Sequence, residues 1–348
     1  MAWLSGYSAR KELTISSVDT LSNYQKKVTL HAHSGTDTEG ADPIIHVPGC
    51  QADFDDIRFT GSDGTTLLDY WIESISGEVA TIWVEMSLAE GDTTVYLYWG
   101  NSSATAVSSG KDTFPFFDDF SGSALDTTTN WDVASGSVTV TGGECTISSG
   151  KIKSKTAVTG PLILRGRIKY TNATQWKSFG WSKSGANDSH LFHAKNTGTA
   201  TTARSSNNSG TQQEVADLGN YCDNAYHTLE LAAISSSSFK YYVDGSLGAT
   251  LTYDIGTSLK IQFEATTSDI IADWILIRKY AATEPTISSW TTESVTEITQ
   301  DTFAYRLVGW EYDQMKGLFN LEFGAPDDYY ISNDVKYKGA VDVSLSLL

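Results

Sequence analysis

The sequence predicts an all-β protein: two tandem antiparallel β-sandwiches, followed by a small β-rich block at the C-terminal end. Three observations support this fold class. Apolar and polar residues alternate with a period of two in many short runs, such as residues 80–85 and 94–99, which is typical of half-buried strands. Turn signals such as Asp244-Gly245 separate these runs at short intervals. At 348 residues, the chain is also too long for one ordinary sandwich.

The composition divides the chain into four segments. These are a first β-sandwich, a linker rich in Ser and Ala, a second β-sandwich, and a small docking or oligomerisation block, and they span residues 1–101, 102–113, 114–284 and 285–348. The last block is too short to bury a large core, so we expect it to dock on another surface. Its final run, 340–348, alternates cleanly and pairs either within its own domain or with a neighbouring chain by strand addition.

The formal net charge of −18 argues against a nucleic-acid partner, because an acidic protein repels phosphate. No stretch of the sequence reaches the roughly 20 apolar residues that are needed to span a membrane, so membrane insertion is not expected. The first residues lack the basic and apolar regions of a secretory signal peptide. Two interpretations stay open: a virion component made in a host cytoplasm, or an exported protein whose signal peptide has been removed.

Several motifs in the first block occur in an order that is seen in one family. The motifs are residues 7–15, 23–28, 56–60, 64–73, 80–84 and 96–101. They make the block similar to a β-sandwich domain of unknown function, which is typical of archaeal and bacterial surface proteins and of some viral proteins. The resemblance implies an architecture, and the family has no settled activity.

The second block resembles concanavalin A-like (laminin G-like) jelly-roll domains. The motifs that carry this resemblance are residues 117–122, 125–126, 130–131, 226–231, 242–245 and 272–275. Such jelly rolls often hold a structural calcium ion where the first strand meets the last, and the resemblance implies Asp118, Asp119 and Asp273 as its oxygen ligands. The alternative is that these carboxylates cap turns or face solvent. No other cofactor is expected.

Aromatic and polar side chains gather in the middle of the second block and suggest a carbohydrate-binding patch. The residues are Trp176, Trp181, Asn187, Asp188, His190 and His193. Aromatic rings stack on sugars, while amides and carboxylates pair with sugar hydroxyls. The alternative is that Trp176 and Trp181 belong to the core.

No catalytic constellation is recognised, and the chain is expected not to be an enzyme. Laminarinase-type relatives of the jelly roll carry the pattern Glu-x-Asp-x-x-Glu on one strand face, and only parts of it occur at 214–217 and 311–313. His31 and His33 are spaced to share a strand face, but no third metal ligand follows at a recognisable distance. A lone pair of this kind is usually a surface feature.

The function predicted from these features is that of a virion structural protein: a tail, fibre or capsid-decoration component on the virion exterior. It is expected to form a homo-oligomer, to contact other virion proteins and to expose its lectin-like sandwiches to host glycans. The alternative is a secreted or cell-surface protein for carbohydrate binding or adhesion.

Overall fold

The computed structural model describes residues 3–171, 176–194, 201–266 and 269–294, together with the backbone of four short strands beyond residue 318. It divides into two compact units, Met1–Glu293 and Ser294–Leu348, and each is treated by itself. Nearly all of the regular structure is β-strand, which confirms the predicted fold class. No helix in the described residues is long and apolar enough to cross a membrane.

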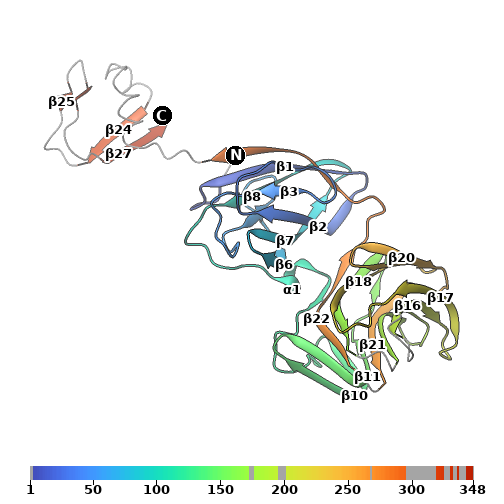
Figure 1. Cartoon of the computed structure of the whole chain (residues 1–348). Helices are drawn as coiled ribbons and strands as arrows, with labels where there is room; N and C mark the ends of the chain where they lie inside the picture. Colours follow the sequence, from blue (N-terminus) through green and yellow to red (C-terminus); the bar gives the residue numbers. More distant parts are fainter. Residues whose placement is uncertain are drawn as a thin grey trace. The chain divides into compact units, whose positions relative to one another are not determined.

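The first sandwich is made of two sheets that share one core (Figure 1). One sheet has the order β23-β1-β8-β4-β5, and the other has the order β3-β2-β7-β6. The strands are β1 (Ala9–Ser17), β2 (Leu21–His31), β3 (Ile44–His46), β4 (Arg58–Thr60), β5 (Leu67–Leu68), β6 (Tyr70–Ser76), β7 (Val79–Leu88), β8 (Gly91–Trp99) and β23 (Thr286–Ser294). Alternate apolar residues, such as Leu13 and Ile15 on β1, point into the core because successive strand side chains face opposite sides.

The second sandwich is one large antiparallel sheet folded over on itself. Its order is β17-β16-β15-β14-β21-β11-β22-β13-β18-β19-β20, with β9, β10 and β12 paired to its side. A single helical turn, α1 (Gly110–Thr113), precedes it. The strands are β9 (Phe116–Asp118), β10 (Trp131–Thr141), β11 (Glu144–Ser154), β12 (Val158–Thr159), β13 (Leu162–Tyr170), β14 (Lys177–Lys183), β15 (Ser189–Ala194), β16 (Thr201–Ser206), β17 (Gln212–Gly219), β18 (Tyr226–Ser235), β19 (Ser238–Val243), β20 (Ser246–Leu251), β21 (Ser258–Ala265) and β22 (Ile270–Lys279).

The core of the second sandwich lies between the two layers of this folded sheet. Trp181 on β14 donates its indole N–H to the carbonyl of Leu231 on β18, over 3.0 Å. Phe192 on β15 contacts the ring of Tyr241 on β19, with centroids 5.1 Å apart. One face of the β16, β15, β14, β21 and β11 layer is therefore buried, and the other face carries the side chains considered below.

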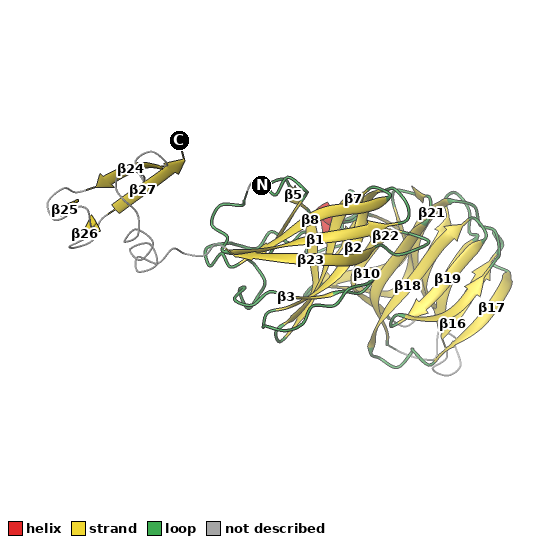
Figure 2. Cartoon of the chain, turned by 90° about the horizontal axis from the view of Figure 1, so that it is seen from above, coloured by secondary structure: helices red, strands yellow, loops and turns green. Residues whose placement is uncertain are grey.

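The predicted boundary between the second sandwich and the terminal block is wrong. Residues 286–294 form β23, which lies beside β1 in the first sandwich (Figure 2). Ile287 is fully buried in that core, and its backbone exchanges two hydrogen bonds with Gly40, of 2.9 and 3.0 Å. The second sandwich is thus inserted between two strands of the first. The sequence analysis placed these residues in the terminal block, because no local pattern shows which sheet a segment of the chain will join.

The two sandwiches meet through a small aromatic cluster. Trp71 and Trp83 of the first sandwich pack against residues of the second, namely Phe114, Phe117, Trp274 and Leu276. Beside this cluster Arg165 donates two hydrogen bonds to the carboxylate of Glu73, of 2.6 and 3.0 Å. Both side chains are largely buried, and the bidentate ion pair offsets the free-energy cost of removing their charges from water.

The C-terminal unit contains two short antiparallel pairs in its described backbone. β24 (Phe319–Gly324) pairs with β27 (Asp342–Leu347), and β25 (Tyr330–Ile331) pairs with β26 (Val335–Lys336). The last strand of the chain therefore pairs within its own unit, which is one of the two alternatives left open by the sequence. The predicted oligomerisation interface consists largely of residues that lie outside the described ones, so this role stays a prediction.

Candidate functional site

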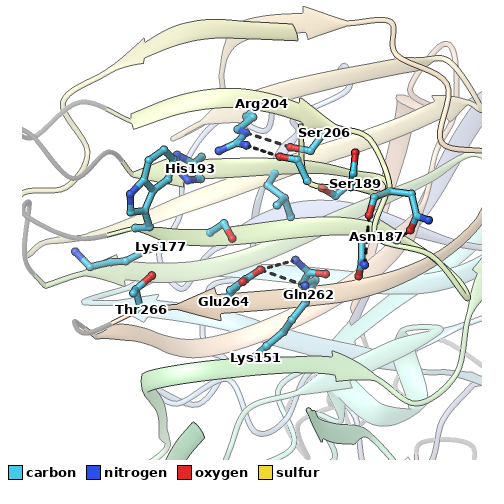
Figure 3. Close-up of a pocket in the computed structure, with 16 residues that line it drawn as sticks. Lys151, Lys177, Asn187, Ser189, His193, Arg204, Ser206, Gln262, Glu264 and Thr266 are labelled. Carbon is cyan, nitrogen blue, oxygen red and sulfur yellow. Dashed lines mark hydrogen bonds and ion pairs between the residues drawn. The ribbon is translucent and has the colours of Figure 1, made fainter. Parts of the chain in front are cut away.

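A pocket of about 440 Å³ lies on the solvent-facing side of the second sandwich (Figure 3). Five neighbouring strands each contribute a side chain: Arg204 from β16, His193 from β15, Ser178 from β14, Gln262 from β21 and Lys151 from β11. These residues are far apart in the sequence and come together only through the order of the strands. The volume falls within the range of small-molecule sites.

Trp176 gives the pocket an exposed aromatic surface. It lies just before β14, it is 43% exposed, and its carbonyl accepts a hydrogen bond of 3.0 Å from the backbone N–H of Thr266. The ring of His193 meets the indole edge to face, with centroids 4.5 Å apart. The guanidinium carbon of Arg204 lies 5.5 Å from the centroid of the same indole. The backbone contact and the two side chains hold the indole in place at the rim of the pocket.

Arg204 is itself fixed by its neighbours. Its Nε donates to the hydroxyl of Ser206 and its Nη2 to the carbonyl of Gly210, both over 3.1 Å. A positioned guanidinium is well suited to planar anionic groups, since its N–H donors form a rigid fork. Burial lowers the pKa of Arg204, but an arginine remains charged at any physiological pH.

Gln262 supplies a polar group that the described side chains and backbone leave unsatisfied. Its side chain is only 3% exposed, and its Nε2 donates to the carboxylate of Glu264 over 3.3 Å. Its Oε1 is buried and has no hydrogen-bond partner among the described residues. An unmade hydrogen bond of this kind costs about 1–3 kcal/mol of stability. A ligand would recover that free energy by donating a hydrogen bond to this oxygen, once the buried amide turns toward the pocket.

Positive charge predominates around the pocket, although the whole chain carries −18. Lys151 and Arg204 line it against one described carboxylate, Glu264, which pairs with Lys151 over 3.2 Å. The ammonium group of Lys177 is buried and donates to Sγ of Cys222 over 3.6 Å. An adjoining hollow of about 310 Å³ is lined by three more lysines, which are Lys153, Lys183 and Lys260. Burial, together with the charges of Lys151 and Lys260, lowers the pKa of Lys153. Cations crowded in this way favour an anionic ligand.

Of the six residues predicted as a carbohydrate-binding patch, three line the pocket: Trp176, Asn187 and His193. The backbone N–H of Asn187 donates to Oδ1 of Asn208 over 2.8 Å, which ties together two loops at the rim. Asp188 does not line the pocket, and its carboxylate accepts a hydrogen bond of 3.2 Å from the hydroxyl of Tyr253.

The assignment of Trp181 and His190 to this patch is wrong, since both are fully buried on the opposite face of the sheet. Trp181 belongs to the core, as the alternative interpretation proposed. His190 stacks on Phe239 with ring centroids 3.8 Å apart, and its ring nitrogens meet the hydroxyl of Tyr241 and the carbonyl of Tyr253. The physical reason is the period-two alternation, which sends adjacent residues of one strand to opposite faces.

The carboxylates predicted to bind calcium do not come together as a ligand group among the described residues. Asp118 accepts hydrogen bonds from the indole of Trp131, over 2.7 Å, and from the backbone N–H of Phe120, over 2.9 Å. Asp119 accepts from the backbone N–H of Ser121, and Asp273 pairs with Arg167 over 2.6 Å. Asp118 and Asp119 accept hydrogen bonds from backbone N–H groups two residues ahead, as the turn-capping alternative expects. The ion pair of Asp273 with Arg167 was not among the alternatives.

Sequence reasoning missed four important residues of the pocket: Lys151, Arg204, Gln262 and Glu264. They form no local motif, so only their positions in strands mark them. Gln262 and Glu264 alternate with the buried Ile261 and Phe263, and this alternation indicates the exposed face without showing which strands lie beside it.

The fold and the pocket together define a β-sandwich protein with a pocket on one face of a jelly-roll sheet. Residues 53–134 match the family described as "Domain of unknown function (DUF2341)". The match overlaps the region of the predicted resemblance from 53 to 101 and continues into the start of the second sandwich. A search of curated proteins finds no match to the chain.

Three similar solved structures each overlie about half of the chain. The β-glucanase of Bacillus licheniformis has 19% identity and a TM-score of 0.40, over 48% of this chain and 98% of the glucanase. An endo-β-1,3-glucanase from Pyrococcus furiosus has 12% identity and a TM-score of 0.41, over 48% and 94%. The carbohydrate binding module CBM66 from Bacillus subtilis has 14% identity and a TM-score of 0.38, over 43% and 96%. At these values the similarities carry no argument about ligand or activity.

Proposed function

We propose that the pocket on the second sandwich binds a saccharide that carries an acidic group, and that it binds this saccharide without cleaving it. The observation that carries the proposal is the buried Oε1 of Gln262, which has no hydrogen-bond partner in the described part of the chain and belongs to the same pocket as the exposed indole of Trp176. A sugar ring offers both an apolar face for the indole and hydroxyl donors for the amide oxygen.

The remaining side chains of the pocket fit the same ligand class. The hydroxyls of Ser189 and Ser206 and the amide of Asn187 suit further sugar hydroxyls. Lys151 and Arg204 provide the positive charge that favours a carboxylate or sulfate substituent over a neutral sugar. An acidic saccharide therefore uses the aromatic, the polar and the charged parts of the pocket at once.

Binding without cleavage is supported by the carboxylates of the pocket. Glycoside hydrolysis ordinarily needs two carboxyl groups, one on each side of the scissile bond. Among the described lining residues Glu264 is the one carboxylate, and it is paired with Lys151. A single carboxylate held in an ion pair is suited to recognition and lacks the partner that hydrolysis requires.

A glycan array of neutral and acidic oligosaccharides, followed by titration of the strongest ligand, tests this proposal. We expect acidic glycans to bind in preference to neutral forms of the same backbone. Trp176→Ala is expected to weaken binding by about tenfold or more, which corresponds to about 1.4 kcal/mol. Leu247→Ala, another exposed apolar residue on the same sandwich, is the matched control and leaves affinity unchanged. Failure of every glycan to bind, or equal affinities for Trp176→Ala and wild type, would refute the proposal.

The biological setting of this binding stays a prediction from the sequence. In the virion interpretation, the pocket attaches a particle to host glycans; in the alternative, it serves a secreted or cell-surface adhesion protein. The proteome of purified virions separates the two, because the chain is expected there only in the first case.

A further inference from the structure

A group of three histidines lies in the first sandwich, remote in sequence from the pocket described above. β2 and β3 run parallel, and their register places His31 directly beside His46. His33 follows two residues after His31, just beyond the end of β2. The three ring centroids are 5.0 to 5.2 Å apart, and one ring nitrogen from each histidine lies within 4.8 Å of the others.

We propose that His31, His33 and His46 bind a divalent transition-metal ion of the zinc class. Imidazole nitrogen is a preferred ligand of Zn²⁺, Cu²⁺ and Ni²⁺, and three imidazoles are a common set of protein ligands for zinc. Zinc binds nitrogen at about 2.0–2.1 Å, so the three nitrogens must move closer together when an ion binds. This inference is independent of the proposed saccharide site.

The hydrogen bonds around two of the rings prepare them to bind a metal ion. Nδ1 of His46 lies 3.1 Å from Oδ1 of Asp37, and Nδ1 of His33 lies 2.9 Å from the carbonyl of Ser34. A carboxylate and a carbonyl can only accept, so each Nδ1 carries the proton and each Nε2 presents its lone pair. Carboxylate and carbonyl partners of this kind orient metal-binding histidines in proteins and raise their basicity.

Asp37 is held firmly in this supporting role. Its side chain is almost fully buried, and the backbone N–H of His46 donates to the same carboxylate over 2.7 Å. Lys11 forms an ion pair with its other oxygen. The carboxylate is therefore fixed on three sides, and it fixes the orientation of the His46 ring.

Gly35 allows the loop after β2 to close over the same ring. A Cβ atom at this position would lie 2.1 Å from Nε2 of His46 and within 2.7 Å of two ring carbons. Every other residue would therefore displace either the loop or the imidazole.

Three protein ligands leave a fourth coordination position on a zinc ion. Because His33 is exposed, a bound ion would remain accessible there to water or to a further ligand.

Titration calorimetry of the tag-free full-length chain with Zn²⁺, after treatment with a chelator, tests this site. The visible absorption of bound Co²⁺ reports nitrogen coordination in the same samples. We expect one equivalent of metal per chain. His33→Gln is expected to weaken binding at least about tenfold. Asp37→Asn is expected to have a similar effect, although Asp37 is not a ligand, because its carboxylate orients His46. Because His33 is exposed, its variant should fold normally, and unchanged thermal unfolding without metal checks this.

His227→Gln is the matched control. Like His46, this histidine contacts carboxylate, from Asp223 and Asp244, but among the described residues its ring meets Tyr221 and no second histidine. Its affinity for Zn²⁺ is expected to equal that of the wild type. Two results would overturn the proposal: a wild-type chain that takes up no Zn²⁺, or a folded His33→Gln variant that binds it as tightly as the wild type.

Discussion

A chain that ends at Pro285 is expected to lose the stability of its first sandwich, whereas a chain that ends at Ser294 is expected to keep it. The nine residues that separate the two forms are β23. Removing them uncovers the edge of β1 and takes Ile287 out of a core in which it is fully buried. An uncovered edge strand also exposes unpaired backbone groups and favours aggregation.

A single substitution tests the same contact without shortening the chain. Ile287→Ala is expected to cost about 2–5 kcal/mol, the usual range for removing a large aliphatic side chain from a core. Ile75→Ala is the matched control, since Ile75 is 43% exposed, and it is expected to change stability by less than about 0.5 kcal/mol. Urea unfolding monitored by tryptophan fluorescence measures both. Equal effects of the two substitutions would contradict the placement of β23 in the first sandwich.

As pH falls from 6.5 to 4, His190 alone is expected to lower the free energy of unfolding of the second sandwich by about 3 kcal/mol. Burial lowers the pKa of His190 to about 4. In this range the folded state keeps the imidazole neutral, while the unfolded chain binds a proton. The contribution of His190 is therefore fully present above the unfolded pKa of about 6.5 and is lost as pH falls towards the folded pKa.

His190→Gln, which keeps polar groups at this position but does not titrate, is expected to flatten the stability curve between pH 6.5 and 4. His227→Gln is the contrasting control. Burial lowers the pKa of His227, but Asp244 and Asp223 outweigh this effect and raise it overall. Its contribution is present below pH 6.5 and is lost as pH rises through the folded pKa. Denaturant unfolding at several pH values measures both. A His190→Gln curve as steep as the wild-type curve would place the imidazole in solvent, contrary to its burial.

The β-strands were predictable because alternation is a local property of the sequence. Runs such as residues 80–85 and 94–99 form strands β7 and β8, as expected. The partner of each strand is a long-range property, and it is not encoded in the run itself. For this reason the sequence alone places residues 286–294 in a terminal block, and it leaves open whether the last strand pairs inside its own unit.

The same distinction explains what was predictable at the two candidate sites. Trp176, Asn187 and His193 lie close together in the sequence, so composition alone grouped them. Arg204, Gln262 and Lys151 reach the pocket only through sheet order. His46 escaped recognition as a third ligand because a parallel pairing, with 14 residues between the paired His31 and His46, brings it to His31. Adjacent residues were the other source of error, since one step along a strand separates the buried His190 from the pocket-lining Ser189 and Leu191.

The most direct test of the saccharide site is to measure thermal unfolding and saccharide titration on one variant, Gln262→Met. Methionine fills a similar volume but removes the buried acceptor, for which the described residues supply no partner. If the amide is kept for a ligand, the variant unfolds at a higher temperature, with a gain of about 1 kcal/mol, and binds the acidic saccharide at least about tenfold more weakly. A variant that is less stable than the wild type and binds the saccharide equally well would show that Gln262 serves the fold, and it would contradict the assignment of this pocket.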